Sequence, residues 1–306
     1  MKETKTFVSI VYSPLKLSHF ILSIFCLTAL LPVWGCVPRE RQGPTVTPAP
    51  QADRVYESWQ KRFRWPEGKR AAISLTFDDA RLTQVDLGIP VLDSHGVKAT
   101  FYVSPRNVTE RLDGWRKAVA NGHEIGNHTM SHPCTGNFMW SREKALEGYT
   151  LEAMAYELEE ANASIFQMLK VRPTTFAYPC GQKFVGRGAN VRSYVPLVAE
   201  RFVVGRGAFD EVGNDPAFCD LAHLAGIQMD GLNYGQIIEL VDNAIEEGRW
   251  LVFFGHDIGA AEYQTTGALA LDELCQYALD PGNGLWIDTV QAVGQYILEQ
   301  RAEKRY

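Results

Sequence analysis

The stretch Ala71-Ala-Ile-Ser-Leu-Thr-Phe-Asp-Asp79 decides how the rest of the sequence is interpreted. A short, mostly apolar run leads directly into two adjacent carboxylates, which is typical of a buried strand that ends at a polar edge. No glycine-rich nucleotide-binding loop follows this first strand; the stretch Thr76-Phe-Asp-Asp-Ala80 stands in the place where such a loop would begin. The sequence therefore predicts a buried strand with two acidic side chains at its carboxyl end.

The same alternation of short apolar runs and amphipathic stretches continues from about residue 65 and is typical of βα units around a parallel sheet. Apolar residues recur at helical spacing in two of the stretches between strands. The expected strands are 71–77, 99–103, 123–127, 175–178, 201–204, 250–255 and 284–287. The clearest helices are 150–169 and 234–247, and another follows the last strand at 289–301. Seven strands with intervening helices favour an α/β fold of the distorted (β/α)7 barrel type over an open doubly wound sheet.

Composition is that of a soluble globular protein with one large core. The chain has 306 residues, of which 46% are hydrophobic and 22% charged. A net charge of -6 and the absence of a basic run interleaved with aromatics argue against a nucleic-acid partner.

The first 36 residues have the pattern of a signal peptide. Three lysines precede an apolar stretch, 20–34, that is short for a bilayer span. The segment ending at Cys36 resembles a bacterial lipoprotein signal, although Trp34 stands where a small residue is usual. We expect lipidation at Cys36 and an exported protein, either membrane-anchored or periplasmic or extracellular; an uncleaved anchor is the alternative.

A tether is expected to follow the signal. Residues 37–52 contain four prolines and no apolar periodicity, so 37–65 is interpreted as a linker and 66–303 as a single catalytic domain.

Two histidine motifs accompany the acidic pair. His128 and His132 lie four residues apart in Asn-His-Thr-Met-Ser-His-Pro, close enough on a helical turn to share one ion. The apolar run 250–255 delivers His256 at the end of a strand, where the C-terminal edge of an α/β barrel collects catalytic groups. Each motif alone also has a structural interpretation, such as a helix cap, a chance histidine pair or a buried histidine.

Together these side chains form a plausible hydrolytic site. One carboxylate and two neutral imidazoles suit a divalent transition metal with open positions. The second carboxylate can take a proton from water, while the metal lowers the pKa of that water and polarises a carbonyl. A separate histidine can protonate the leaving amine or alcohol. The sequence thus predicts metal-assisted hydrolysis of an amide or ester.

Over about residues 70–290 these motifs resemble the polysaccharide deacetylases with a NodB-homology domain, carbohydrate esterase family 4. The resemblance implies that Asp79, His128 and His132 hold the metal, that Asp78 is the catalytic base and that His256 is the general acid. It implies removal of acetyl groups from an acetylated polysaccharide.

The stretch Phe176-Ala-Tyr-Pro-Cys-Gly181 resembles the third motif of that family. The resemblance implies a wall of the substrate groove, with the Cys180 amide in the oxyanion hole; the groove residues are Tyr178, Pro179, Cys180 and Gly181. Ala177 stands where the family commonly has an arginine that orients the catalytic aspartate. Arg206 either enters the cavity in its place or lies at the surface. The fourth motif, whose aspartate tunes the acid histidine, has no counterpart within 200–225.

Four cysteines remain in the exported domain, namely Cys134, Cys180, Cys219 and Cys275. They permit three pairings into two disulfides, and buried free thiols are the alternative. We prefer Cys134 with Cys180, because the motifs place both beside one cavity.

Several secondary residues have two interpretations. Tyr178, Phe138, Trp140 and Tyr102 either form sugar-stacking walls or fill the core. For His123 a buried structural role is expected, and Asp257 either orients a neighbour or caps a turn.

The ligand set suits zinc best, with cobalt or nickel as alternatives. The expected partners are an acetylated polysaccharide, either an N-acetylglucosamine polymer or O-acetylated xylan, and a membrane through the lipid anchor. A small-molecule C–N hydrolase of the same fold and a non-catalytic glycan-binding protein remain as alternatives.

Overall fold

A computed structural model describes residues 63–303 of the chain. The expected signal peptide, the lipidation site Cys36 and most of the tether lie outside these residues, so those assignments and the domain limits stay predictions. Within 63–303 no helix is both long enough and apolar enough to cross a membrane.

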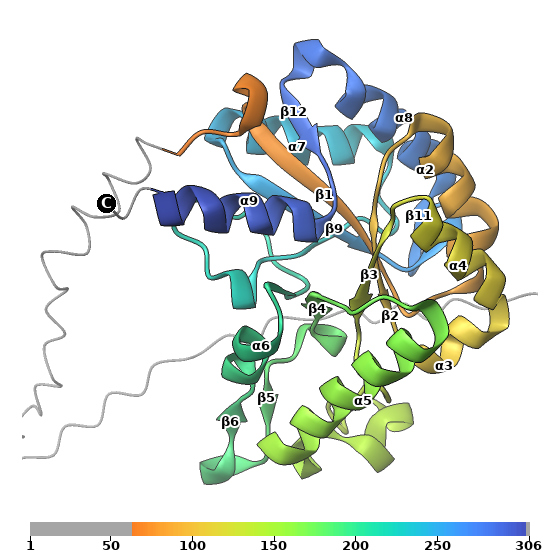
Figure 1. Cartoon of the computed structure of the whole chain (residues 1–306), viewed down its shortest axis with the longest axis vertical. Coiled ribbons are helices and arrows are strands. Elements are labelled where there is room, and N and C mark those ends of the chain that lie inside the picture. The colour runs from red at the N-terminus through yellow and green to blue at the C-terminus, as the bar shows by residue number, and fades with distance from the viewer. Residues whose placement is uncertain (1–62, 304–306) are drawn as a thin grey trace, which may run out of the picture. The chain divides into compact units, whose positions relative to one another are not determined.

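One parallel sheet organises the described residues, and β1 (Ala71–Asp78) stands at its centre (Figure 1). β9 (Trp250–Gly255) pairs along one side of β1. β12 (Leu285–Ile287) pairs with the start of β1 on the other side, and β2 (Thr100–Val103) pairs with its end. The order is β7-β4-β3-β2-β1-β9-β8, with β12 beside β1; the remaining strands are β3 (Glu124–Asn127), β4 (Thr175–Ala177), β7 (Val204–Arg206) and β8 (Ile227–Gln228). Because these strands are parallel, their carboxyl ends meet at one edge.

Every residue of β1 is buried, and its two faces have different neighbours. Ile73, Leu75 and Phe77 belong to the large core cluster that the outer helices cover. The alternate residues face the inside of the curved sheet, where Thr76 donates a hydrogen bond to the Phe253 carbonyl. The alternation of side chains along a strand therefore directs Asp78 inward.

Most helices cover the outside of the sheet. They are α2 (Ile89–His95), α3 (Pro105–Val108), α4 (Leu112–Ala120), α5 (Leu151–Leu169), α6 (Val195–Arg201), α7 (Tyr234–Glu247) and α8 (Ala268–Leu279). The last helix, α9 (Val290–Glu303), packs instead on the inner face, against Ala72, Val204 and Trp250. Thr150 caps α5 by accepting a hydrogen bond from the Ala153 amide, and Asn233 and Gln236 form a capping box on α7. The three helices expected from the sequence, 150–169, 234–247 and 289–301, are confirmed to within two residues at each end.

The sheet curls into a distorted half-barrel, which confirms the expected fold class. Leu224 lies in the chain between the outer strands β7 and β8. Its backbone amide donates to the Gly205 carbonyl at 2.8 Å, and its carbonyl accepts from the Gly207 amide at 2.7 Å. The strand expected at 201–204 was wrong: α6 extends to Arg201, the Phe202 amide still bonds to the Val198 carbonyl, and the strand begins at Val204. The two-residue strand β8 was not expected at all.

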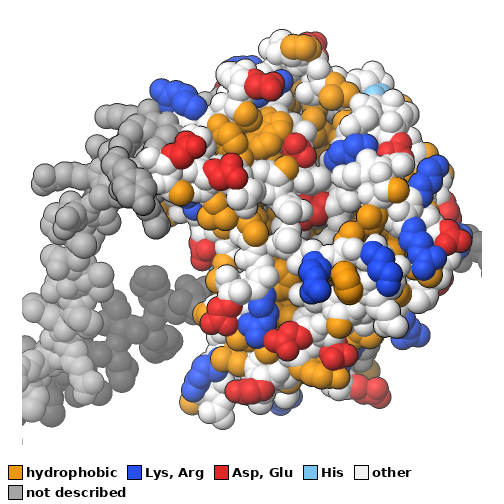
Figure 2. Space-filling view, in the orientation of Figure 1, with side chains coloured by type: hydrophobic (Ala, Val, Ile, Leu, Met, Phe, Trp, Pro, Cys, Tyr) orange, Lys and Arg blue, Asp and Glu red, His pale blue; other side chains and the backbone are white. Residues whose placement is uncertain are grey.

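Two short strand pairs lie outside the main sheet. β5 (Phe184–Val185) pairs antiparallel with β6 (Arg192–Ser193), and β10 (Asp257–Gly259) pairs with β11 (Thr265–Gly267). On the face seen in Figure 2, acidic and basic side chains are interspersed and neither sign dominates.

Candidate active site

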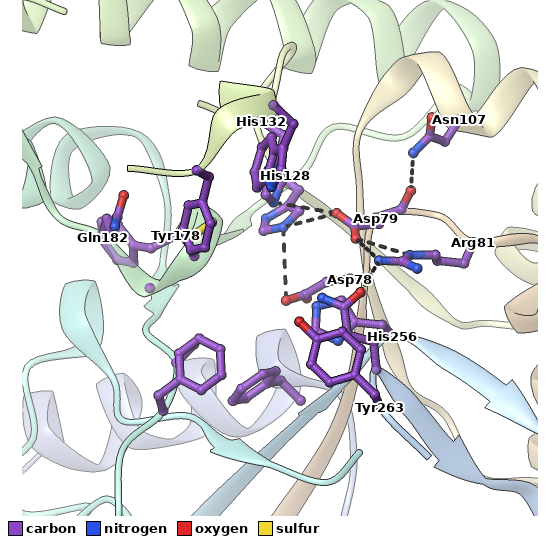
Figure 3. Close-up of a pocket in the computed structure, with 18 residues that line it drawn as sticks. Asp78, Asp79, Arg81, Asn107, His128, His132, Tyr178, Gln182, His256 and Tyr263 are labelled. Atoms are coloured by element: carbon purple, nitrogen blue, oxygen red, sulfur yellow. Dashed lines mark hydrogen bonds and ion pairs between the residues drawn. The ribbon is translucent and has the colours of Figure 1, made fainter. Parts of the chain in front are cut away.

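A cavity of about 600 Å³ lies at the carboxyl edge of the sheet (Figure 3). Its lining includes the acidic pair, the three motif histidines and part of the third motif; the residues are Asp78, Asp79, Arg81, Asn107, His128, His132, Phe138, Trp140, Tyr178, Cys180, Gly181, Gln182, Ala208, Phe209, Phe254, His256, Tyr263 and Gln264. Motifs that are far apart in the sequence therefore meet in one place.

The three expected metal ligands converge. The carboxylate oxygen Oδ1 of Asp79 lies 3.7 Å from Nε2 of His128 and 3.5 Å from Nε2 of His132. One donor atom from each residue lies within 4.8 Å of the other two. Asp79 and His132 adopt left-handed backbone conformations, with φ of 75° and 53°. Such conformations are costly for residues other than glycine and are concentrated at functional sites.

Neighbouring groups fix the orientation of these ligands. Nδ1 of His128 lies 2.9 Å from the carbonyl oxygen of Ala177, so Nδ1 donates and Nε2 carries the free lone pair. Arg81 donates two hydrogen bonds to Oδ2 of Asp79, which leaves Oδ1 facing the histidines. Asn107 donates to the backbone carbonyl of Asp79 at 2.7 Å.

The charges of the ligands suit a cation. Burial alone raises the pKa of Asp79, but His128, His132 and Arg81 outweigh burial and lower the pKa to about 2. Burial, together with His128, lowers the pKa of His132 to about 4. At neutral pH the carboxylate is therefore charged and the His132 imidazole is neutral, as a divalent metal requires.

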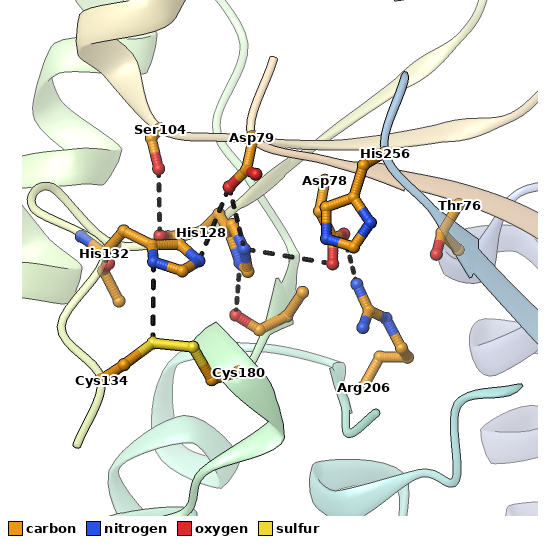
Figure 4. Close-up of polar contacts among 12 residues, drawn as sticks. Thr76, Asp78, Asp79, Ser104, His128, His132, Cys134, Cys180, Arg206 and His256 are labelled. Atoms are coloured by element: carbon orange, nitrogen blue, oxygen red, sulfur yellow. Dashed lines mark hydrogen bonds and ion pairs between the residues drawn. A yellow bond between two sulfur atoms is a disulfide. The ribbon is translucent and has the colours of Figure 1, made fainter. Parts of the chain in front are cut away.

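Asp78 has a buried cationic partner. The Arg206 guanidinium, fully buried at the end of β7, donates to Oδ1 of Asp78, while Oδ2 lies 4.0 Å from Nε2 of His128 (Figure 4). Arg206 is held by Tyr102 and Phe254, whose ring centroids both lie 5.1 Å from its Cζ. Of the two roles considered for Arg206, the structure excludes the surface role: its guanidinium is buried and pairs with Asp78, although Arg206 is not itself among the residues that line the cavity.

His256 has an acidic partner that the sequence did not indicate. Nδ1 of His256 lies 2.6 Å from Oδ2 of Asp230, and Oδ1 of Asp230 accepts from Thr266 at 2.8 Å. Burial by itself lowers the pKa of His256, but the hydrogen bond to Asp230 and the nearby charges of Asp78 and Asp79 raise it overall. Asp230 follows β8, and a two-residue strand gives too weak an apolar signal to mark the aspartate after it.

The third motif forms part of the cavity wall. Tyr178, Cys180 and Gly181 line the cavity, whereas Pro179 is buried and is not among the lining residues. The Tyr178 hydroxyl donates to the carbonyl of Ala222, so its polar end is bonded within the protein.

Cys180 forms a disulfide with Cys134, which confirms the preferred pairing. Cys219 and Cys275 are free. Two disulfides were permitted by the sequence, and the described residues contain this one.

The secondary aromatic residues divide between wall and core. Phe138 and Trp140 are exposed, stack on one another at 5.4 Å between centroids and line the cavity. Tyr102 is fully buried against Arg206 and is a core residue. His123 is buried and contacts Asp93, as expected, and Asp257 accepts hydrogen bonds from Arg81 and Thr83.

The described residues form a parallel α/β half-barrel with a cluster of carboxylates and histidines at its carboxyl edge. The family model for polysaccharide deacetylase matches residues 65–193. This match confirms the resemblance drawn from the motifs: residues 65–193 are similar to the polysaccharide deacetylase family.

Curated relatives match over short segments. The uncharacterized protein YlxY of Bacillus subtilis is 32% identical over 30% of this chain and 26% of its own length. Peptidoglycan-N-acetylglucosamine deacetylase PgdA of Listeria monocytogenes is 28% identical over 36% of this chain and 21% of its own. Chitooligosaccharide deacetylase of Bradyrhizobium is 42% identical over 20% of this chain and 29% of its own. The chain thus spans less than a third of each of these relatives.

Solved structures support the fold. A candidate polysaccharide deacetylase from Mycobacterium smegmatis has a TM-score of 0.57 and 16% identity, covering 78% of this chain and 94% of that one. A family 4 acetyl xylan esterase from Clostridium thermocellum, in complex with a cobalt ion, has a TM-score of 0.50 and 19% identity, covering 74% and 91%. At these identities the likeness concerns architecture alone.

Proposed function

We propose that the chain is a metal-dependent deacetylase that removes acetyl groups from an acetylated polysaccharide. The observation that carries the proposal is the meeting of Asp79, His128 and His132 around one point, with Asp78 and His256 in the same cavity. The match of residues 65–193 to the family model for polysaccharide deacetylase supports the same reaction class.

Asp79, His128 and His132 are the residues that would hold the metal. A charged carboxylate and two imidazole nitrogens fit zinc best and also suit cobalt or nickel. When bound, the metal supplies Lewis-acid polarisation of the acetyl carbonyl and makes water more acidic.

Asp78 acts as the general base. Its Oδ1 is fixed by Arg206, so Oδ2 is the oxygen that takes a proton from the attacking water. The water oxygen bonds to the acetyl carbon. We assign the stabilisation of the negative charge on the carbonyl oxygen to the amide of Cys180, because the motif resemblance implies this role and Cys180 lines the cavity.

His256 acts as the general acid. Asp230 accepts from Nδ1, which leaves Nε2 to donate a proton to the leaving nitrogen or oxygen of the sugar as its bond to the acetyl carbon breaks. Acetate and a free amine or hydroxyl are the products. The exposed pair Phe138 and Trp140 offers apolar surfaces on which sugar rings can stack.

We further propose that the enzyme is exported and held at a membrane through lipid on Cys36. The signal-like leader and the proline-containing tether support this location. A tethered, exported deacetylase meets wall or extracellular glycans, which favours a polymer over a small molecule as the substrate.

An acetate-release screen tests the proposal and the metal dependence together. We expect release from at least one of chitooligosaccharides, peptidoglycan and acetylxylan, loss of release after treatment with a chelator, and recovery when zinc, cobalt or nickel is added back. Full activity in the chelated enzyme, with metal content verified as absent, would contradict the role of Asp79, His128 and His132. A chain that binds these glycans and releases acetate from none is a glycan-binding protein.

Replacing Asp230 by Asn is expected to move the high-pH limit of activity to lower pH. His256 must be protonated to act as an acid, and the hydrogen bond to Asp230 raises its pKa, so wild-type activity is lost as pH rises through that raised value. Without the carboxylate charge the pKa falls, and activity is lost earlier. The pH dependence of kcat/KM measures the shift. Asp220→Asn, in a carboxylate that caps a surface turn, is the control. An unchanged profile in the Asp230 variant would mean that His256 is not the acid.

A further inference from the structure

One covalent bond joins two walls of the active site. Cys134 lies two residues after His132, and its Sγ is 3.7 Å from Nδ1 of that histidine (Figure 4). Its disulfide partner Cys180 lies 46 residues further along the chain and lines the cavity. The bond therefore ties a loop that carries a proposed metal ligand to the loop that carries the proposed oxyanion amide.

Both ends of this connection have backbone conformations that need support. His132 and Cys180 each have a φ of 53°, in the left-handed region that disfavours residues with a side chain. On its own loop, Cys134 is fixed by Ser141, whose hydroxyl accepts from the Cys134 amide at 3.0 Å and donates to its carbonyl at 2.8 Å. Because these two hydrogen bonds hold Cys134 in its loop, the disulfide restrains the position of Cys180 relative to that loop.

The two loops also have a non-covalent connection. The Thr135 amide donates to Oε1 of Gln182 at 2.7 Å, immediately beside the disulfide. Opening the disulfide should leave the loops adjacent and the barrel folded, but it removes the fixed distance between His132 and the Cys180 peptide.

We propose that the Cys134–Cys180 disulfide is a positioning element of the site, and that its reduction weakens metal binding and slows turnover in the folded enzyme. The cysteines act through His132 and through the Cys180 peptide and take no part in the reaction. The effect on turnover rests on the proposed deacetylase function, whereas the effect on metal affinity does not.

A phosphine reductant opens the bond without supplying a thiol that competes for metal. Phosphorus attacks one Sγ and the S–S bond breaks; water then supplies oxygen to phosphorus and protons to the two sulfurs. The phosphine loses two electrons to become its oxide, and Cys134 and Cys180 each become a thiol.

The experiment compares full-length wild type, Cys134→Ser/Cys180→Ser and Cys275→Ala, each with and without phosphine. Cys275 is a free buried cysteine in α8, outside the cavity lining, so its variant keeps the disulfide. Zinc affinity is measured by competition with a chromophoric chelator, kcat and KM by acetate release, and folding by urea unfolding. The serine variant also removes thiols that could bind zinc themselves.

In reduced wild type we expect zinc affinity to fall about 10–100-fold, as for the loss of groups that orient a metal ligand. We expect kcat to fall about tenfold or more, because small displacements of reacting groups are costly. The serine variant should match reduced wild type and ignore phosphine, and Cys275→Ala should respond as wild type does. If the serine variant does not fold, wild type reduced after folding gives the answer.

The proposal is overturned if reduction lowers only the free energy of unfolding and leaves zinc affinity and kcat unchanged. It is also overturned if the serine variant still loses activity on adding phosphine. An oxidised chain that binds zinc but releases no acetate from any substrate refutes the proposed function, and the zinc measurement still decides on the disulfide.

Discussion

Asp78→Asn is expected to lower acetate release by about 10²–10⁴-fold, the range that a positioned general base contributes. Asparagine keeps the size of the side chain but cannot take a proton from water. The proposed metal ligands are left intact, so metal content should stay near that of wild type. Single-turnover acetate release and elemental analysis of the purified variant measure the two quantities.

A matched control is Asp86→Asn, which removes an exposed carboxylate that pairs with Arg111 at the surface. Exposed pairs of this kind contribute little to stability, and this one lies outside the cavity lining. The control should keep wild-type activity. Turnover by Asp78→Asn within a fewfold of wild type would assign the base to another residue.

Arg206→Met is expected to lower the free energy of unfolding by about 3–5 kcal/mol, since it leaves the buried Asp78 carboxylate without its ion-pair partner. Methionine can still pack between Tyr102 and Phe254, so the loss reports mainly the unpaired charge. Activity should fall as well, because Oδ1 of Asp78 is no longer fixed. Urea unfolding and kcat measure the two effects.

The double variant Asp78→Asn/Arg206→Met separates charge from packing. Once Asp78 is neutral, removing Arg206 no longer strands a buried carboxylate, so the double variant should be more stable than Arg206→Met alone. Arg111→Met, at an exposed ion pair, is the control and should change stability little. If the loss of unfolding free energy in the double variant equals the sum of the losses in the two single variants, the two side chains are not coupled.

The sequence predicted those parts of the fold that depend on strong local patterns. β1 is a mostly apolar run and β9 is a continuous one. The bounds of β9 were predicted correctly, and so were those of α7 from its apolar spacing. Where a pattern was ambiguous the prediction failed: the apolar residues from Phe202 onward suggested a strand from residue 201, but the last turn of α6 includes Arg201.

The site was predictable where its residues are adjacent in the sequence. Asp78 with Asp79, and His128 with His132, each form a local motif, and the structure brings all four together with His256 in one cavity.

Supporting residues that arrive from other strands left no such signal. Arg206 reaches Asp78 from β7, 128 residues along the chain, and Asp230 reaches His256 from beyond the two-residue strand β8. Arg81 lies two residues after Asp79, but only the fold shows that its guanidinium contacts Asp79 and Asp257. These partners become neighbours only in the folded protein, and a single sequence does not show which distant residues lie close together.

The central position of β1 also affects when the proposed site is assembled. Thr76 bonds to the Phe253 carbonyl across 177 residues, and Arg206 reaches Asp78 across 128 residues. Closing such long loops costs entropy before any contact compensates it, so high contact order slows folding. We therefore expect the residues of the proposed site to come together late in folding, when most of the barrel has formed, so that the proposed activity appears only at that stage.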